Sequence, residues 1–188
     1  CTLAAYAFAR FEFFGRDVAF ALVLVQLMIM PEVLIVENYR TMSRIGAVDT
    51  IMGIGLPYMA SAFGIFLLRQ TFKAIPRELE EAAMIDGYSR LGAFVKMVLP
   101  ISTSGILTVV IFSFTLVIQE YIYTLTFVTG ASKYTVSVGV PTFLVHGDVY
   151  NWGGLMAGVL ITAIPITIVY NFFVNRFIAG LTLGAVKG

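Results

Sequence analysis

The feature that most constrains this chain is a set of long windows that hold no charged residue. Three such windows lie at 50–68, 97–119 and 149–175, and a fourth at 18–36 is interrupted only by Pro31-Glu32. A helix needs about 20 mostly apolar residues to cross the hydrocarbon core of a bilayer. The windows therefore predict four complete membrane-spanning helices.

The composition excludes most other kinds of protein. Apolar residues make up 59% of the chain and charged residues 12%, whereas a soluble domain carries about 25% charged residues. A formal net charge of +1 offers no basic surface for nucleic acid. The single cysteine excludes a disulfide framework and a cysteine-based metal cluster. We therefore expect an all-α integral membrane protein in which residues 1–188 form one polytopic helical bundle.

The start of the chain is expected to belong to a further helix. Residues 1–9 form an uncharged run that ends at Arg10. Nine residues are about half the length that a membrane span needs. This pattern is typical of the exit half of a helix that begins upstream, so we expect a missing amino-terminal part and about six spans, four whole and one partial in this chain. The alternative, that Cys1 is the lipid-bearing residue of a lipoprotein, is disfavoured because such anchors are seldom combined with several spans.

The basic residues predict the orientation. Lys and Arg are retained on the cytoplasmic side of membrane helices, and nine of them fall in one alternate set of connecting segments against three in the other. The larger set consists of Arg10, Arg16, Arg69, Lys73, Arg77, Arg90, Lys96, Arg176 and Lys187, and the smaller set of Arg40, Arg44 and Lys133. We therefore expect segment 69–96 and the carboxyl terminus in the cytoplasm, and segments 37–49 and 124–148 outside.

The longest cytoplasmic connection, 73–99, has the signals of two short helices joined by a turn. Pro76 suits the first turn of a helix, and acidic residues near the amino end of that helix complement its dipole. Gly87 supplies the left-handed residue that ends the first helix. Ser89 can cap a second helix, which runs up to Pro100, where the next span opens.

Two interpretations of this segment are open. It could be an interfacial connector, but apolar residues such as Leu79 and Ile85 are few, and its first helix is acidic where anionic lipid attracts Lys and Arg. Small residues combined with acids are better suited to a groove on a partner protein. A short rigid helix in such a groove transmits movement of the partner to the membrane spans.

The same segment resembles the EAA signature of the permease subunits of binding-protein-dependent ABC importers. The match consists of Glu81-Ala82-Ala83, three residues, Gly87, nine residues, a position that is usually Ile, one residue, and Leu99-Pro100. The single departure is Met97, which is apolar and of similar bulk. Residues 3–11, 66–70, 164–169 and 180–188 are similar to the second, maltose-permease-type subunit of carbohydrate importers.

The resemblance implies a role in ATP-driven import. Members of that family pair with a second permease subunit, bind two cytoplasmic ATPase subunits and receive a sugar from an extracytoplasmic substrate-binding protein. The chain has no glycine-rich phosphate-binding loop ending in Lys-Ser or Lys-Thr, so we expect a translocation subunit that is not an enzyme and has no cofactor, with ATP and Mg bound by the ATPases. We expect the chain to be surrounded by lipid in the plasma (inner) membrane of a prokaryote.

The resemblance also assigns roles to individual residues. By this likeness the coupling-helix core that sits in the ATPase groove consists of Glu81, Ala82, Ala83 and Gly87. Asp86 precedes the turn, and Leu99-Pro100 corresponds to the hinge into the next span.

Ionisable residues inside spans are costly, and for that reason they are functional candidates. Glu32 and Glu120 are the two, and both are expected near the outer mouth of the membrane path. Gln119, Tyr121 and Tyr123 add hydrogen-bonding groups and rings of the kind that bind sugars. The alternative is an interfacial carboxylate beside an aromatic belt, with the partner permease holding the sugar alone.

Other functions are less well supported by the sequence. An ATP-independent secondary transporter or channel subunit is expected to carry ionisable residues near the midplane of several spans, and 50–68 and 149–175 carry none. A membrane-embedded enzyme would need paired carboxylates or a metal cluster, and His146 with Asp148 forms neither a metal site nor a triad. The long external segment 124–151 is expected to dock the binding protein.

Overall fold

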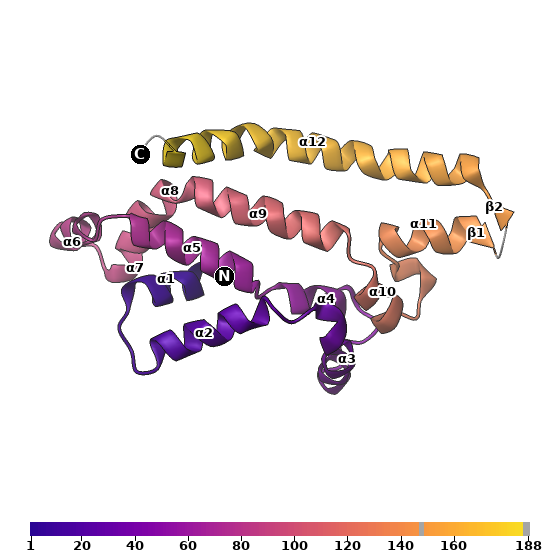
Figure 1. Ribbon diagram of the computed structural model, residues 1–188, viewed down its shortest axis with the longest axis horizontal. Helices are drawn as coiled ribbons and strands as arrows, with labels where there is room; N and C mark the ends of the chain where they lie inside the picture. The colour runs from indigo at the N-terminus through magenta and orange to yellow at the C-terminus, as the bar shows by residue number, and fades with distance from the viewer. Residues whose placement is uncertain (147–148, 186–188) are drawn as a thin grey trace. The chain divides into compact units, whose positions relative to one another are not determined.

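The computed structural model describes the backbone of residues 1–146 and 149–185, and the side chains of residues 1–145 and 150–174 (Figure 1). Asp148 and Lys187, and the side chains of His146 and Arg176, lie outside the described residues. The described chain is almost entirely helical, as expected. Two short strands, β1 (Val145–His146) and β2 (Val149–Tyr150), pair antiparallel in a hairpin that the sequence analysis did not anticipate.

The chain divides into two compact units. Unit 1 combines Cys1–Met28 and Ala60–Phe112 with the chain from Val174, and unit 2 combines Ile29–Met59 with Ser113–Phe173. Each unit therefore brings together segments that are distant in the sequence.

Unit 1 contains the segment that resembles the EAA signature. Its elements are α1 (Thr2–Arg10), α2 (Arg16–Gln26), α5 (Ala62–Ala74), α6 (Glu78–Ile85), α7 (Arg90–Ala93), the π-helical turn η3 (Phe94–Val98), α8 (Leu99–Ile101) and the first part of α9 (Thr103–Ile118). Helix α1 packs along α5 (Figure 1). The apolar core of unit 1 consists of Ala5, Tyr6, Ala9, Ile65, Leu68, Phe72, Ile75, Phe94, Val98 and Val109.

Small residues set the helix spacing in unit 1. Ala5 is fully buried and Ala9 almost so, which lets α1 approach α5 closely. At Gly105 in α9, a Cβ atom would lie 2.7 Å from the Oγ1 atom of Thr71 in α5. The Thr71 hydroxyl is itself bonded to the carbonyl of Leu67, so it cannot readily move aside. Helix α9 therefore packs on α5 at a distance that only glycine permits at this position.

Unit 2 is built around a smaller apolar core. Its elements are η1 (Pro31–Leu34), α3 (Ile35–Arg44), α4 (Ile51–Gly55), η2 (Leu56–Tyr58), the end of α9, α10 (Ile122–Phe127), η4 (Ala131–Lys133), α11 (Val136–Leu144), the hairpin, and α12 (Trp152–Ala185) up to Phe173. The core holds Met42, Ile54, Tyr123, Phe127 and Val128. Figure 1 shows the hairpin joining α11 to α12.

An acidic clip links two loops of unit 2. Asp49, which adopts a left-handed backbone with φ of 60°, accepts hydrogen bonds from the backbone N–H groups of Thr129 and Gly130 at 3.0 and 3.2 Å. Its other carboxylate oxygen pairs with Lys133. The hydrogen bond from Lys133, followed by the two backbone donors, holds the pKa of Asp49 well below its usual range. The clip therefore stays charged in moderately acidic medium.

The membrane spans are less regular than the sequence predicted. Among the described residues, the segment Trp152–Val174 is the one helix long and apolar enough to cross a bilayer unbroken. The other three predicted spans are pairs of helices with a break, which gives up to four spans if each pair crosses once. The windows at 50–68 and 97–119 are therefore bent helix pairs and not single straight helices.

Prolines and hydroxyl side chains account for two of these breaks. Pro57 lies in the 3₁₀ turn before the break at residues 59–61, and the Ser61 hydroxyl accepts the Gly64 N–H at 3.1 Å to begin α5. Pro100, which has no N–H to donate, follows the π-helical turn, and the chain bends by 76° between Arg90–Ile101 and Thr103–Ile118. At these breaks in the predicted spans, nearby groups therefore form hydrogen bonds with the backbone N–H and C=O groups.

Candidate functional site

The predicted helix, turn and helix of the EAA-like segment are present in unit 1. Helix α6 ends in a Schellman motif: the N–H of Gly87 donates to the carbonyl of Met84, and the N–H of Tyr88 donates to that of Ala83, both at 3.1 Å. Gly87 has φ of +90°, a conformation that side chains with a Cβ atom rarely adopt. The sequence-based assignment of Gly87 as the left-handed residue is confirmed.

The second half of the loop differs in detail from the prediction. The Ser89 hydroxyl caps α7 by accepting the Gly92 N–H at 3.1 Å, as expected. The helix then widens, because the Leu99 N–H donates to the carbonyl of Phe94, five residues earlier. Leu99 and Pro100 lie in the short helix α8, and the next span begins at Thr103 rather than at Pro100.

The two faces of α6 have different surroundings. On one face, Glu80 and Ala83 are buried within unit 1. On the other, Glu81, Ala82 and Asp86 are exposed. The side chain of Ile85 is 86% exposed, and Tyr88 and Leu91 beyond the turn are exposed as well. Exposed apolar side chains beside small and acidic ones are typical of a protein-docking surface. We call Glu81, Ala82, Ile85, Asp86 and Gly87 the outer face of α6.

Glu80 is one of the acidic residues, with Glu78 and Glu81, that the sequence analysis expected near the amino end of the first loop helix, where they complement its dipole. Its carboxylate accepts a hydrogen bond of 2.7 Å from the Tyr6 hydroxyl and forms an ion pair with Arg10, both on α1. Arg10 also donates to the carbonyl of Ile75, just after α5, at 2.9 Å. The spacing of Glu80 and Ala83, three residues apart, places both on one face of the helix, and the structure shows that this face is the buried one.

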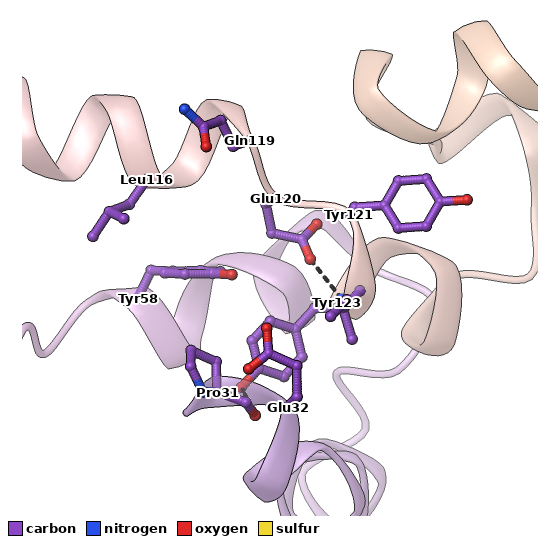
Figure 2. A pocket seen from close by; sticks show the side chains of 9 residues that line it. Pro31, Glu32, Tyr58, Leu116, Gln119, Glu120, Tyr121 and Tyr123 are labelled. Carbon is purple, nitrogen blue, oxygen red and sulfur yellow. Dashed lines mark hydrogen bonds between the residues drawn. The ribbon is translucent and has the colours of Figure 1, made fainter. Parts of the chain in front are cut away.

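A pocket of about 170 Å³ in unit 2 contains all five predicted substrate-path residues (Figure 2). Its walls consist of Pro31, Glu32, Tyr58, Leu116, Gln119, Glu120, Tyr121, Ile122 and Tyr123. They come from the 3₁₀ turns η1 and η2, the end of α9, the connection 119–121 and the start of α10. The sequence could not show that these elements meet, because the residues lie up to 92 positions apart.

Glu120 serves the scaffold of this pocket. The residue is 3% exposed. Its carboxylate accepts hydrogen bonds from the backbone N–H groups of Tyr123 at 2.5 Å and Thr124 at 3.2 Å. The Thr124 hydroxyl adds a third hydrogen bond at 2.5 Å. Figure 2 shows the carboxylate turned toward Tyr123. The negative charge therefore caps the amino end of α10, where the helix dipole favours it, while Glu120 also lines the pocket.

Of the other lining residues, some are buried in the wall of the pocket and others are exposed to solvent. Tyr123 is buried, with its ring 5.6 Å from that of Tyr58, and its hydroxyl accepts from the Asn38 amide at 2.8 Å. Glu32 and Gln119 are exposed, so their polar groups are available to a solute. Tyr121 is exposed too, but its ring points away from the other lining side chains in Figure 2.

The electrostatic character of the pocket is acidic. It holds the carboxylates of Glu32 and Glu120, and no Lys, Arg or His occurs among the described residues that line it. Across the part of the chain that the structure describes, no group of three or more His, Cys, Asp or Glu side chains could hold a metal ion. The chemistry available in the pocket is therefore hydrogen bonding and aromatic contact.

Replacing Glu120 tests its scaffold role. We expect Glu120→Ala to lower stability by about 1 to 2 kcal/mol, because the amino end of α10 loses its cap, and Glu120→Gln to lower it less because one acceptor oxygen remains. Glu32→Ala is the matched control, since Glu32 is exposed on the same pocket. The measurement is the thermal unfolding midpoint of the purified protein in detergent. Equal midpoints for Glu120→Ala and Glu32→Ala would contradict the capping role.

Comparison with known proteins identifies the family. The family described as "Binding-protein-dependent transport system inner membrane component" matches residues 2–182. The chain is 34% identical to the trehalose/maltose transport system permease protein MalG of Thermococcus litoralis, over 100% of this chain and 68% of that protein. It is also 34% identical to the sn-glycerol-3-phosphate transport system permease protein UgpE of Pectobacterium atrosepticum, over 95% of this chain and 64% of that protein.

The fold is similar to that of a solved ABC transporter. A chain from the crystal structure of a bacterial ABC transporter involved in import of the acidic polysaccharide alginate superposes with a TM-score of 0.76 and 22% identity, covering 92% of this chain and 66% of that one. The chain thus spans about two thirds of the length of the proteins it matches. It belongs to the inner membrane components of binding-protein-dependent transport systems, and is a multi-pass permease component of an ABC importer rather than an ATPase.

Proposed function

We propose that this permease forms one half of the translocation path for an uncharged carbohydrate or related polyol, driven by ATP hydrolysis in partner subunits. The observation that carries the proposal is the loop of α6, Gly87 and α7, which presents a small, acidic outer face on a rigid capped helix. The partners are a second permease subunit, two cytoplasmic ATPase subunits that bind ATP and Mg, and an extracytoplasmic binding protein. One crossing is assigned to each of the first two bent helix pairs and one to α9, which with α12 gives four spans.

The outer face of α6 is the contact with an ATPase subunit. Glu81 and Asp86 offer charges, Ala82 leaves room for close approach, and Ile85 supplies an exposed apolar contact. Residues 73–99 act as the cytoplasmic coupling loop. Movement of the loop reaches the span α9 through Leu99 and Pro100, which lie immediately before the 76° bend. This bend is the hinge of the coupling mechanism.

The pocket of unit 2 supports an uncharged solute. One relative is named for trehalose and maltose, another for sn-glycerol-3-phosphate, and the structural neighbour for an acidic polysaccharide. A phosphate or uronate group approaching Glu32 and Glu120 would meet two negative charges and no described basic side chain. The Gln119 amide and the Tyr58 hydroxyl suit the hydroxyl groups of a neutral sugar. The acidic lining therefore favours neutral sugars over anions.

Gly87→Val tests the coupling loop. Valine at a positive φ costs about 1 to 2 kcal/mol, and nothing lies within 4 Å of a Cβ atom at Gly87, so the effect is on backbone shape alone. We expect uptake by the assembled complex to fall more than tenfold while membrane insertion persists. Gly15→Val is the matched control, because Gly15 has φ of +79° and equally open surroundings outside the loop.

The readouts are uptake and ATP hydrolysis stimulated by the binding protein. Gly15→Val should keep both near the unaltered level. If Gly87→Val matches Gly15→Val in both measurements, the loop does not contact the ATPase.

Labelling of single cysteines tests the orientation. In a chain with Cys1→Ser, we expect Ser132→Cys to react with an impermeant maleimide added to whole cells with a permeabilised outer envelope, because the positive-inside rule places η4 outside. Tyr88→Cys, on the opposite side, should react only after the cytoplasmic membrane is opened. Both positions are exposed in the structure. Labelling of Tyr88→Cys alone in intact cells would invert the proposed topology.

Glu32→Gln tests the pocket. We expect the half-saturation concentration for uptake of radiolabelled trehalose or maltose to rise about fivefold, the effect of losing about 1 kcal/mol from one hydrogen bond to a charged acceptor, with the maximal rate retained. Glu37→Gln removes another exposed carboxylate, which pairs with Arg40 away from the pocket walls. It should leave uptake unchanged. The same half-saturation concentration in both variants and the unaltered protein would remove Glu32 from the path.

A further inference from the structure

A buried ion pair joins α6 to α1 in unit 1. The Glu80 and Arg10 side chains are 9% and 8% exposed. Both carboxylate oxygens are used, since Arg10 Nε donates to Oε1 and the Tyr6 hydroxyl donates to Oε2. A second Arg10 nitrogen donates to the carbonyl of Ile75. We call Tyr6, Arg10 and Glu80 the α1–α6 clasp.

Burying the charges of the α1–α6 clasp costs free energy of desolvation. Removing charges from water costs several kcal/mol per ion, and well-packed apolar residues of similar volume are often equally stabilising. An apolar contact, however, lets surfaces slide, whereas a carboxylate held by two directional donors admits one arrangement. The clasp therefore specifies the position and orientation of α6 more than it adds stability.

The contacts of Tyr6 extend this link to both sides of the loop. Its ring lies 6.1 Å edge-on to Phe72 of α5 and 4.3 Å from Phe94, which begins the π-helical turn after α7. Phe72 and Phe94 are themselves in edge-on contact at 6.0 Å. The chain entering the loop, the loop helix and the chain leaving it thus all meet α1 at Tyr6.

We propose that Tyr6, Arg10 and Glu80 are positioning residues that make α6, the end of α5 and α1 move as one body when an ATPase subunit displaces the loop. The inference rests on the proposed coupling role of α6. Without the clasp, α6 would pull on its neighbours through the chain on either side of it, residues 75–77 toward α5 and residues 86–89 toward α7. With it, displacement of the outer face of α6 is delivered to α1 and α5 at the same time.

Distance measurements between spin labels test this proposal. In a chain with Cys1→Ser, labels at Leu3→Cys on α1 and Glu78→Cys on α6 occupy exposed positions. In the complex with both permeases and the ATPases, we expect a single label distance that is the same without nucleotide and with bound ATP. In Arg10→Leu/Glu80→Leu, which removes both buried charges together, we expect the distance to broaden or shift when ATP binds. Asp17→Asn, which breaks the exposed pair with Arg16, is the control.

Binding-protein-stimulated ATP hydrolysis gives a second readout that does not depend on the solute. A purely structural clasp would alter the yield of complex but leave the distance of the assembled fraction constant in both nucleotide states, and that result overturns the proposal. If the double variant does not assemble, Tyr6→Phe decides, because it keeps the ring and the ion pair. We expect its label distance to broaden with ATP, and an unchanged distance overturns the proposal.

The failure of the proposed function has a different signature. If the ATPases bind and are stimulated equally by chains with and without Ile85→Asp on the outer face of α6, the loop is not the coupling contact, and the present inference falls with it. If Ile85→Asp abolishes ATPase binding while the clasp variants leave the distance constant, the coupling role stands and the clasp proposal alone is wrong.

Discussion

Backbone N–H and C=O groups inside a bilayer have no water to bond with, and each unpaired group costs several kcal/mol. This chain breaks its predicted spans several times, so local side chains must take over where the helical ladder stops. Ser61 caps α5 and Glu120 caps α10, each by accepting backbone N–H groups at the start of the helix. The breaks are thereby made tolerable at membrane depth. The pocket and the proposed hinge at Leu99-Pro100 both lie beside such breaks.

In the pocket of unit 2, the residues that hold the backbone in place are different from those whose polar groups are exposed. Glu120 and Tyr123 are both buried and hydrogen-bonded within the chain. Glu32 and Gln119 are exposed, and these are the residues that we propose contact a solute. A carboxylate inside a span is thus not by itself a substrate ligand, because the same charge is the natural cap for a helix that starts there.

The proposed coupling loop shows the same division between adjacent acids. Successive residues of an α-helix point about 100° apart, so Glu80 faces α1 while Glu81 faces away. The inward acid fixes the helix and the outward acid remains for a partner. The family signature emphasises Glu81, yet the proposed transmission of force to α1 depends on Glu80, which the signature does not include.

The sequence by itself determined the membrane class, the family and the turn at Gly87. These follow from local properties: the length of uncharged windows, the spacing around Glu81, and the need for a left-handed residue after a short helix. Tertiary structure decided where the spans break, which glutamates are buried, and that Glu32 meets Glu120 in one pocket. The reason is that hydropathy reports how apolar a residue's surroundings must be, but not which residue 70 positions away supplies the partner for a buried charge such as Glu80.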